Sequence, residues 1–279
     1  MTVIWIFLII AAAVFALWVF MIAPRPCKNP LIKTLQKARY AHRGLHHIKA
    51  GVPENSMLAF GLAVKEGLGI ELDVHLSKDG KLVVEHDDTL NRTAGDPRTI
   101  ESSNWSDLKG LRLEGTQETL PRLEDVFRLV EGKVPLLIEM KTVGGNQKIL
   151  AEAVAKALET YQGPYCVESF DPRVLYFFGK CAPKVIRGQL AGDVCKEASN
   201  VSPLINFLLK NLLVNVISRP DFVAYNYQDR ENRSFRLCRF LFRPPLFFWT
   251  VKSVEGENIS AEAKAAPIFE RLDGWNDTV

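Results

Sequence analysis

The sequence predicts an α/β fold, an eight-stranded βα barrel with a small insertion, preceded by one transmembrane helix. Three observations lead to this prediction. The first 24 residues are almost wholly apolar. The rest of the chain alternates short β-rich runs with helical patterns, over a length that suits a barrel of about 250 residues. One of the nine β-rich runs follows its neighbour through a turn too short for a parallel crossover, so eight runs remain for the barrel.

The composition excludes several classes of protein. The chain has 279 residues, of which 47% are hydrophobic and 24% are charged, and this excludes collagen-like and broadly disordered chains. A net charge of +3 is too small to indicate a nucleic-acid partner. The five cysteines form no C-x-x-C pair, which argues against a disulfide framework or a zinc site and favours a reducing compartment.

Residues 1–24 are predicted to be a transmembrane anchor. The run 3–23 has no charge and no proline, and about 20 helical residues are enough to cross a bilayer core of about 30 Å. A cleaved signal peptide is the alternative. However, no Lys or Arg precedes the run, and the run exceeds the usual apolar core of a signal peptide. A buried helix of a soluble protein is disfavoured because every face is apolar.

Residues 25–38 are predicted to be a basic juxtamembrane linker. The basic residues Arg25, Lys28, Lys33, Lys37 and Arg39 follow the apolar run, and the first acidic residue of the chain is Glu54. The positive-inside rule then predicts a single-pass membrane protein whose catalytic domain lies on the cytoplasmic face. The same stretch could rest on anionic membrane lipid.

Residues 39–279 are predicted to form the barrel. The strand candidates, in order, are 39–44, 69–76, 81–87, 135–141, 165–170, 184–190, 222–227, 246–251 and 267–272. Clear helical patterns occupy 57–67, 122–131 and 147–161. The Asp79-Gly80 turn predicts an antiparallel hairpin, which makes one of its two strands peripheral. Residues 88–120 are turn-rich and are expected to be an insertion over one barrel end.

Two pairs of charged residues predict a metal site. Glu71 and Asp73 are two residues apart on a predicted strand, so their side chains point to one face. Like charges in a barrel interior need a neutralising cation, and oxygen ligands suit Mg²⁺ or Ca²⁺ better than zinc. Glu139 and Lys141 repeat the spacing at the end of another apolar strand. A buried strand that ends in charged residues is typical of the catalytic mouth of a barrel.

Two histidines end predicted strands and complete the candidate site. His42 and His86 have imidazoles that titrate near neutral pH, so one can accept a proton while the other donates one. Arg43 and Lys141 supply positive charge for phosphate oxygens. Three further histidines are expected to be ordinary core or surface residues: His46, His47 and His75. This combination predicts cleavage of a phosphate ester.

These residues lie in motifs that resemble the glycerophosphodiester phosphodiesterase family. The motifs are A-H-R-G (41–44), P-E-N-S-x-x-A-F (53–60), G-x-E-L-D-V-x-L-S-K-D-G (69–80), V-V-x-H-D-x-T-L-x-R (83–92) and L-I-E-M-K (137–141). S-F-D-P (169–172) and W-T-V (249–251) resemble later motifs of the family. The resemblance implies a TIM barrel that hydrolyses glycerophosphodiesters to glycerol 3-phosphate and an alcohol.

The resemblance also implies a role for each candidate residue. A divalent cation, Mg²⁺ or Ca²⁺, would be held by Glu71, Asp73 and Glu139, and His42 and His86 would form the acid/base pair. The substrate would meet Arg43, Lys141, Trp249 and Glu54, the last at the metal or the glycerol. Attack by the substrate's own hydroxyl, giving a cyclic phosphate, stays open beside direct hydrolysis.

The chain departs from the family pattern at two places. Glu168 stands where relatives commonly carry glutamine, and the T-D-x-P ending after the last strand is absent. Three functions therefore stay open beside each other. The first is hydrolysis of glycerophosphodiesters, the second is lysophospholipase D-type or phospholipase activity on lysophospholipids or membrane lipid, and the third is a catalytically silent membrane scaffold.

Two apolar segments near the carboxyl end of the chain, 203–217 and 235–249, each have two structural interpretations. Residues 203–217 are almost wholly apolar, and residues 235–249 interleave arginine with aromatic residues. They are typical of a core helix and a buried strand. Alternatively, they form a barrel face on the bilayer, with Arg236, Arg239 and Arg243 at the lipid phosphates.

Overall fold

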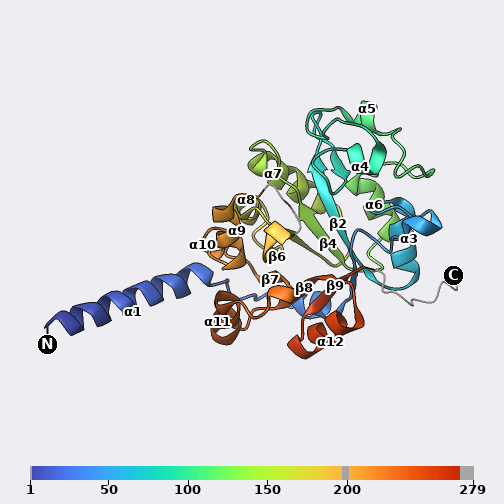
Figure 1. Ribbon diagram of the computed structural model, residues 1–279. Coiled ribbons are helices and arrows are strands. Elements are labelled where there is room, and N and C mark those ends of the chain that lie inside the picture. Colours follow the sequence, from blue (N-terminus) through green and yellow to red (C-terminus); the bar gives the residue numbers. More distant parts are fainter. Residues whose placement is uncertain (1, 197–200, 271–279) are drawn as a thin grey trace.

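A computed structural model describes residues 2–196 and 201–270, which form a barrel from which one long helix projects (Figure 1). Eight parallel strands close the barrel in the order β1-β9-β8-β7-β6-β5-β4-β2, with β1 pairing β2. The predicted TIM barrel is therefore confirmed. All nine predicted strand runs contain a strand, and the last two residues of the run 267–272 lie outside the described part of the chain.

The strands are short and almost wholly buried, and the burial is expected for a barrel whose inner and outer faces are both covered. They are β1 (Tyr40–Ala41), β2 (Gly69–Leu76), β3 (Leu82–Val84), β4 (Leu136–Met140), β5 (Tyr165–Ser169), β6 (Arg187–Ala191), β7 (Phe222–Asn226), β8 (Leu246–Val251) and β9 (Ala266–Phe269). β3 pairs only with β2, in antiparallel orientation. The hairpin predicted at Asp79-Gly80 is thus confirmed, and β3 is its peripheral strand.

Helices cover the outside of the barrel and connect its strands. The longer ones are α1 (Thr2–Ile22), α3 (Met57–Lys65), α6 (Leu123–Val130), α7 (Gln147–Leu158), α8 (Pro172–Cys181), α9 (Pro203–Lys210), α11 (Arg233–Phe242) and α12 (Val254–Ala263). The shorter ones are α2 (Ile32–Lys37), α4 (Asn91–Ala94), α5 (Trp105–Leu108), α10 (Asn215–Ser218) and three 3₁₀ turns, Ile48–Ala50, Val194–Lys196 and Tyr227–Asp229.

Residues 88–120 form a small lobe beyond the β2–β3 hairpin, where α4 and α5 lie in Figure 1. The lobe has its own apolar cluster, which includes Leu90, Ile100 and Leu108. It also contacts the barrel strand β2, because His75 Nδ1 lies 2.7 Å from Glu101 Oε1. The lobe is therefore attached beside the carboxyl ends of β2 and β3.

Residues 25–38 lie on the barrel. Arg25 forms an ion pair with Asp221 at 2.6 Å, immediately before β7. In α2, Ile32 and Leu35 are buried in the cluster that fills the amino-terminal end of the barrel, and Tyr40 donates a hydrogen bond to the Leu35 carbonyl at 2.9 Å. This segment closes the end of the barrel that is opposite the mouth.

The apolar segments 203–217 and 235–249 differ from the expectation of a core helix and a buried strand. In 203–217, Leu209, Leu212 and Val214 are buried, but most apolar side chains of α9 are exposed. The strand interpretation is wrong for residues 235–242, which belong to α11. The reason is that Arg236, Arg239 and Arg243 recur at helical spacing, and only 246–251 is a strand.

Candidate active site

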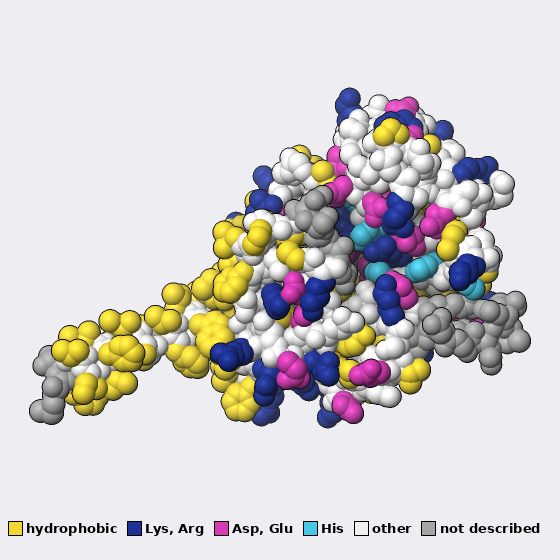
Figure 2. All heavy atoms as spheres, in the orientation of Figure 1, with side chains coloured by type: hydrophobic (Ala, Val, Ile, Leu, Met, Phe, Trp, Pro, Cys, Tyr) yellow, Lys and Arg dark blue, Asp and Glu magenta, His cyan; other side chains and the backbone are white. Residues whose placement is uncertain are grey.

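The carboxyl ends of the barrel strands bring the predicted site residues together. Asp73, Glu139 and Glu168 are register partners on β2, β4 and β5, so their side chains point into the barrel side by side. A pocket opens at this end, and Figure 2 shows histidine, basic and acidic side chains gathered in a hollow of the surface. The pocket is lined by His42, Arg43, Glu71, His86, Glu139, Lys141, Glu168, Phe170, Leu190, Trp249, Thr250 and Ile268.

Three buried carboxylates form a cluster with the geometry of a metal site. One oxygen from each of Glu71, Asp73 and Glu139 lies within 4.8 Å of the others. Ligands on opposite sides of a calcium ion, each about 2.3–2.6 Å from it, are about 5 Å apart. Burial, followed by the charges of Asp73 and Glu139, raises the pKa of Glu71 well above its ordinary value. A bound cation would relieve this repulsion, so the cluster fits a divalent cation with oxygen ligands.

Glu168 supports the same interpretation. Its side chain is buried, and its Oε2 accepts no hydrogen bond from any residue that the structure describes. Burial and the charges of Glu71 and Glu139 raise the pKa of Glu168 well above its ordinary value. The departure from the family pattern thus points inward and adds a fourth acidic group to the pocket.

Lys141 lies between two of the carboxylates. Its Nζ is 3.0 Å from Asp73 Oδ1 and 2.8 Å from Glu139 Oε1. Burial opposes the positive charge, but Asp73 and Glu139 outweigh it and raise the pKa of Lys141. Lys141, with His86 and Arg43, also holds the pKa of Asp73 below its ordinary range despite the burial of that carboxyl. Lys141 is therefore a fixed positive charge at the floor of the pocket.

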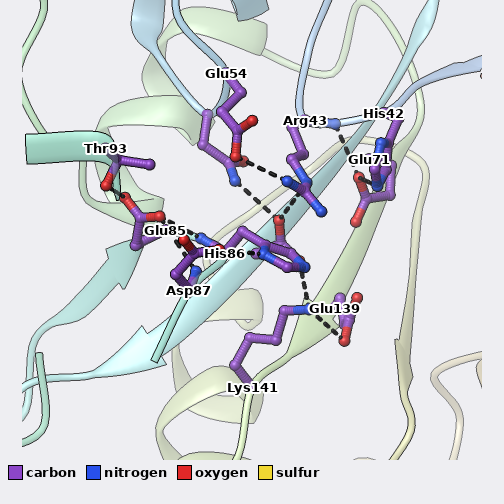
Figure 3. A network of polar contacts seen from close by, with 12 residues as sticks. His42, Arg43, Glu54, Glu71, Glu85, His86, Asp87, Thr93, Glu139 and Lys141 are labelled. Carbon is purple, nitrogen blue, oxygen red and sulfur yellow. Dashed lines mark hydrogen bonds and ion pairs between the residues drawn. The ribbon is translucent and has the colours of Figure 1, made fainter. Parts of the chain in front are cut away.

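Arg43 follows β1 in a tight turn. Its backbone has φ 54°, and the next residue, Gly44, has φ 81° with Ala59 and Phe60 too close for a Cβ. This turn aims the Arg43 backbone N–H at Glu71 Oε2, to which it donates at 2.9 Å. The guanidinium donates from Nη1 to Glu54 Oε1 at 2.8 Å. Arg43 thus contacts Glu71 through its backbone, while its guanidinium lies between Glu54 and Asp73, whose Oδ2 is 3.6 Å from Nε (Figure 3).

The loop before α3 contributes one predicted residue and one that sequence reasoning missed. Glu54 is held between Arg43 and Arg92, with Arg92 Nη2 at 2.6 Å from Glu54 Oε1, and it is not in the carboxylate cluster. Asn55, noted in the sequence only as part of the P-E-N-S motif, donates from Nδ2 to Asp73 Oδ2 at 2.9 Å. Ser56 caps α3, because its Oγ accepts a hydrogen bond from the Ala59 backbone N–H.

His42 lies at the edge of the pocket. Its Nε2 is 3.9 Å from Glu71 Oε2, and its Nδ1 is 3.1 Å from Glu270 Oε1. Burial lowers the pKa of His42 to about 4, although Glu270 opposes the shift. Sequence reasoning missed Glu270. The position of Glu270 at the end of the last strand could have indicated a contact with His42 at the end of the first strand. The first and last strands become neighbours when a barrel closes.

His86 follows β3 and lies near Lys141 (Figure 3). Its Nδ1 lies 2.7 Å from Asp87 Oδ1. The backbone N–H groups of His86 and Asp87 both donate to Glu85 Oε1, at 2.9 and 3.2 Å, and Thr93 holds the other oxygen of Glu85. Glu85 therefore fixes the loop that carries His86, a role that the sequence motif did not indicate.

Trp249 lines the pocket from β8, where the sequence resemblance placed it. Its ring meets Phe170 edge to face, with centroids 5.4 Å apart. The two rings form an apolar wall opposite the charged residues. The structure thus brings every predicted site residue to the mouth. Glu54 does not join the carboxylate cluster and is connected to it through Arg43.

Comparisons with known proteins agree with this architecture. The sequence model of the glycerophosphoryl diester phosphodiesterase family matches residues 42–226. A glycerophosphodiester phosphodiesterase of Bacillus altitudinis is 35% identical over 169 residues, which cover 57% of this chain and 68% of that protein. Lysophospholipase D GDPD1 of Rattus norvegicus is 25% identical over 200 residues, covering 66% of this chain and 57% of that protein.

A solved structure shows the same fold. An Oleispira antarctica phosphodiesterase, in complex with the product sn-glycerol-3-phosphate, superposes with a TM-score of 0.69 at 20% identity. The superposition covers 86% of this chain and 94% of that chain. With the family match over most of the barrel, the chain belongs to the glycerophosphoryl diester phosphodiesterase family, a family of phosphoric diester hydrolases.

Proposed function

We propose that this protein hydrolyses glycerophosphodiesters to glycerol 3-phosphate and an alcohol at the mouth of the barrel. The observation that carries the proposal is the meeting of three buried carboxylates with two histidines in one pocket. A catalytically silent scaffold would have no need to keep this costly cluster of buried charge.

Glu71, Asp73 and Glu139 would hold the divalent cation, Mg²⁺ or Ca²⁺. When bound, the cation supplies positive charge that polarises the phosphodiester and stabilises the charge of the transition state. Asn55 and the Arg43 backbone N–H orient two of the ligand carboxylates.

His42 acts as the base. Its low pKa keeps the imidazole neutral at pH 7, and the contact of Nδ1 with Glu270 leaves Nε2 facing the carboxylates. Nε2 can then accept the proton of the attacking hydroxyl. That hydroxyl belongs either to water or to the glycerol of the substrate. Glu270 stabilises the imidazolium that forms.

His86 acts as the acid. Its Nδ1 is engaged by Asp87, so Nε2 is the nitrogen that can donate a proton to the departing alcohol oxygen. In Figure 3, His42 lies beside Glu71 and His86 lies apart from it, near Lys141, so two different imidazoles are available for the two proton transfers. The proton accepted at His42 and the proton donated from His86 balance the reaction.

The remaining pocket residues bind the substrate. Arg43 and Lys141 compensate the phosphodiester charge, and Glu54 aligns the Arg43 guanidinium through their hydrogen bond. Trp249 and Phe170 provide an apolar wall for the glycerol or alcohol carbon atoms.

A lysophospholipase D-type activity is the second candidate. The apolar helix α1 favours it, because a membrane protein meets lysophospholipids directly, and one relative is a lysophospholipase D. Helix α1 is long and apolar enough to cross a bilayer, a property that signal sequences share.

For this chain we propose a retained single span (1–24), a segment packed on the barrel (25–38) and a barrel (39–279) on the cytoplasmic face. Support for retention comes from the barrel itself. Asn215 Nδ2 donates to the Ile22 carbonyl at 2.8 Å, and Arg219 Nη1 donates to the Phe20 carbonyl at 3.0 Å. Cleavage after the helix would remove both acceptors.

The test is hydrolysis by the full chain in phospholipid nanodiscs, with glycerophosphocholine and lysophosphatidylcholine compared side by side. EDTA is added first, and then Mg²⁺ or Ca²⁺ is restored. Metal-dependent release of glycerol 3-phosphate from the soluble diester is expected. Cleavage of only the lysolipid would favour the second candidate, and inactivity of folded, metal-bound protein on both would favour the scaffold.

A further inference from the structure

We propose that the outer surface formed by α9, α10 and α11, here called the α9–α11 surface, rests on the anionic lipid bilayer that α1 crosses. This inference rests on the proposed transmembrane span. It adds a specific orientation, in which the barrel lies directly on the membrane and its α9–α11 surface faces the lipid.

The length of α1 sets the level of the barrel. Its apolar span, Val3–Ile22, has 20 residues, which at about 1.5 Å per residue matches a hydrocarbon core of about 30 Å. The whole helix is therefore needed to cross, and its last turn lies at the boundary with the lipid headgroups. Trp18 Nε1 in that last part donates to Ser234 Oγ of α11 at 3.1 Å. Helices α10 and α11 thus lie at headgroup level.

The joint between α1 and the barrel is rigid. Ile22 is fully buried, and Asn215 of α10 donates to its carbonyl. Arg219 donates to the carbonyls of Phe20 and Ala23, both at 3.0 Å, and its guanidinium lies 4.3 Å from the centroid of the Phe20 ring. These contacts fix the direction of α1 relative to α10 and α11, so the orientation of the membrane follows from that of the helix.

The α9–α11 surface has the apolar side chains that such a position requires. In Figure 2, hydrophobic side chains continue from α1 onto the barrel where α9 and α10 lie in Figure 1. The exposed large apolar residues of the surface are Leu204, Ile205 and Phe207 on α9, Ile217 on α10, and Phe240, Leu241 and Phe242 on α11. Phe240 is 76% exposed and Leu204 is 66% exposed, so both would reach lipid rather than the protein core.

Positive charge accompanies these residues. Arg236, Arg239 and Arg243 are exposed along α11 and just after it. Arg239 and Arg243 form no ion pair with any part of the chain that the structure describes. Arg236 differs, because its Nη1 forms an ion pair with Glu231 Oε2 at 3.6 Å. Unpaired arginines next to exposed phenylalanines match an interface of lipid phosphates above acyl chains.

The surface extends along the side of the barrel from one end to the other. Helix α10 precedes the amino end of β7, where Arg25 pairs with Asp221, and α9 follows the carboxyl end of β6. The barrel therefore lies on its side, and its mouth opens along the bilayer rather than away from it. In Figure 1, α1 accordingly leaves the side of the barrel next to α10 and α11.

The test measures contact with lipid chains in the full-length protein. A fluorophore is attached at Leu204→Cys or Phe240→Cys, in a background in which Cys27, Cys181 and Cys195 are replaced by Ser. The protein is placed in nanodiscs of phosphatidylcholine and phosphatidylglycerol, with and without a nitroxide on the lipid chain. Ile149→Cys, at an α7 residue that is 62% exposed, is the matched control, and Phe7→Cys is the reference within α1.

We expect the lipid nitroxide to quench probes at positions 7, 204 and 240 but not at 149. In the Phe240→Cys protein, Arg239→Glu and Arg243→Glu should each lower the equilibrium constant for contact of the surface with anionic discs, as reported by quenching at position 240. The expected decrease is at least about fivefold, because one basic residue near the membrane contributes about 1 kcal/mol. Quenching at 7, with positions 204 and 240 behaving as 149, would overturn the surface and leave the span intact. No quenching at position 7 would overturn both the surface and the transmembrane span. Diester hydrolysis measured in the same discs tests the proposed enzymatic function separately.

Discussion

Asn55 donates a hydrogen bond from Nδ2 to Asp73 Oδ2 at 2.9 Å, and both side chains are fully buried at the barrel mouth. The bond joins the loop before α3 to the middle of the carboxylate cluster. Asn55 has φ 50°, a conformation that asparagine tolerates better than most residues. One residue thus satisfies a backbone requirement and orients a proposed metal ligand.

We predict that Asn55→Gly lowers the affinity for the divalent cation by about 10–100-fold, because Asp73 loses the partner that orients it. Glycine keeps the positive φ, so the backbone is not the cause. Isothermal titration with Ca²⁺ and Mg²⁺ measures the affinity. Unchanged affinity in Asn55→Gly would contradict the role of Asn55.

The buried His42 should make the metal-free protein less stable as the pH falls. Its pKa is about 4 when folded, against an ordinary value of 6.5, so the unfolded state binds the proton more readily between these values. The contribution of His42 to the free energy of unfolding therefore decreases as the pH falls from 6.5 to 4, by at most about 3 kcal/mol. Denaturant unfolding in detergent with EDTA measures this, and His42→Asn should flatten that part of the curve. An identical slope in both proteins would contradict the buried neutral imidazole.

His86→Ala should lower kcat by about 10²–10⁴-fold if His86 protonates the leaving alcohol. The loss should be much smaller for a nitrophenyl phosphodiester, because nitrophenolate leaves without a proton. Steady-state kinetics on both substrates give the comparison. Equal losses on the two substrates would show that His86 acts in some other way.

Cys238 reports on the joint between α1 and the barrel. Burial raises the pKa of its thiol to about 12, and its Sγ lies 3.5 Å from the Ile22 carbonyl. At pH 8 it should resist alkylation, whereas the exposed Cys181 and Cys195 should react. Trp18→Ala combined with Arg219→Ala should increase labelling of Cys238, as read by mass spectrometry. Labelling of Cys238 in the unaltered chain as fast as that of Cys181 would contradict the docked helix.

The fold and the centre of the site could be predicted because local signals carried them. The alternation of β and α runs predicted the barrel, and the i, i+2 spacing of Glu71 and Asp73 predicted the shared face. The contact between His42 and Glu270 was missed, because no local pattern indicates it and it follows only from the pairing of the first and last strands in the closed barrel. Asn55 was missed for a related reason, because an asparagine in a turn usually serves the turn itself.

The α9 and α11 segments show the limit of composition. The composition of an apolar run with interleaved arginines fits a buried strand, a core helix or a membrane-facing helix, although the spacing of Arg236, Arg239 and Arg243 favours a helix. Only the packing of Phe235 and Cys238 toward the barrel, with Phe240 outward, shows which side of α11 is buried. Tertiary contacts, rather than local sequence, decide this.

The central claim is metal-dependent phosphodiester hydrolysis at the carboxylate cluster. The most direct measurement is ³¹P NMR of glycerophosphocholine hydrolysis by the full chain, with the metal removed and then restored, for the unaltered protein, Glu71→Gln and the exposed control Glu152→Gln. We predict that the unaltered protein and Glu152→Gln release glycerol 3-phosphate only with metal, and that Glu71→Gln stays folded and inactive. Full activity of Glu71→Gln with metal present, or of the unaltered protein in excess EDTA, would contradict the account.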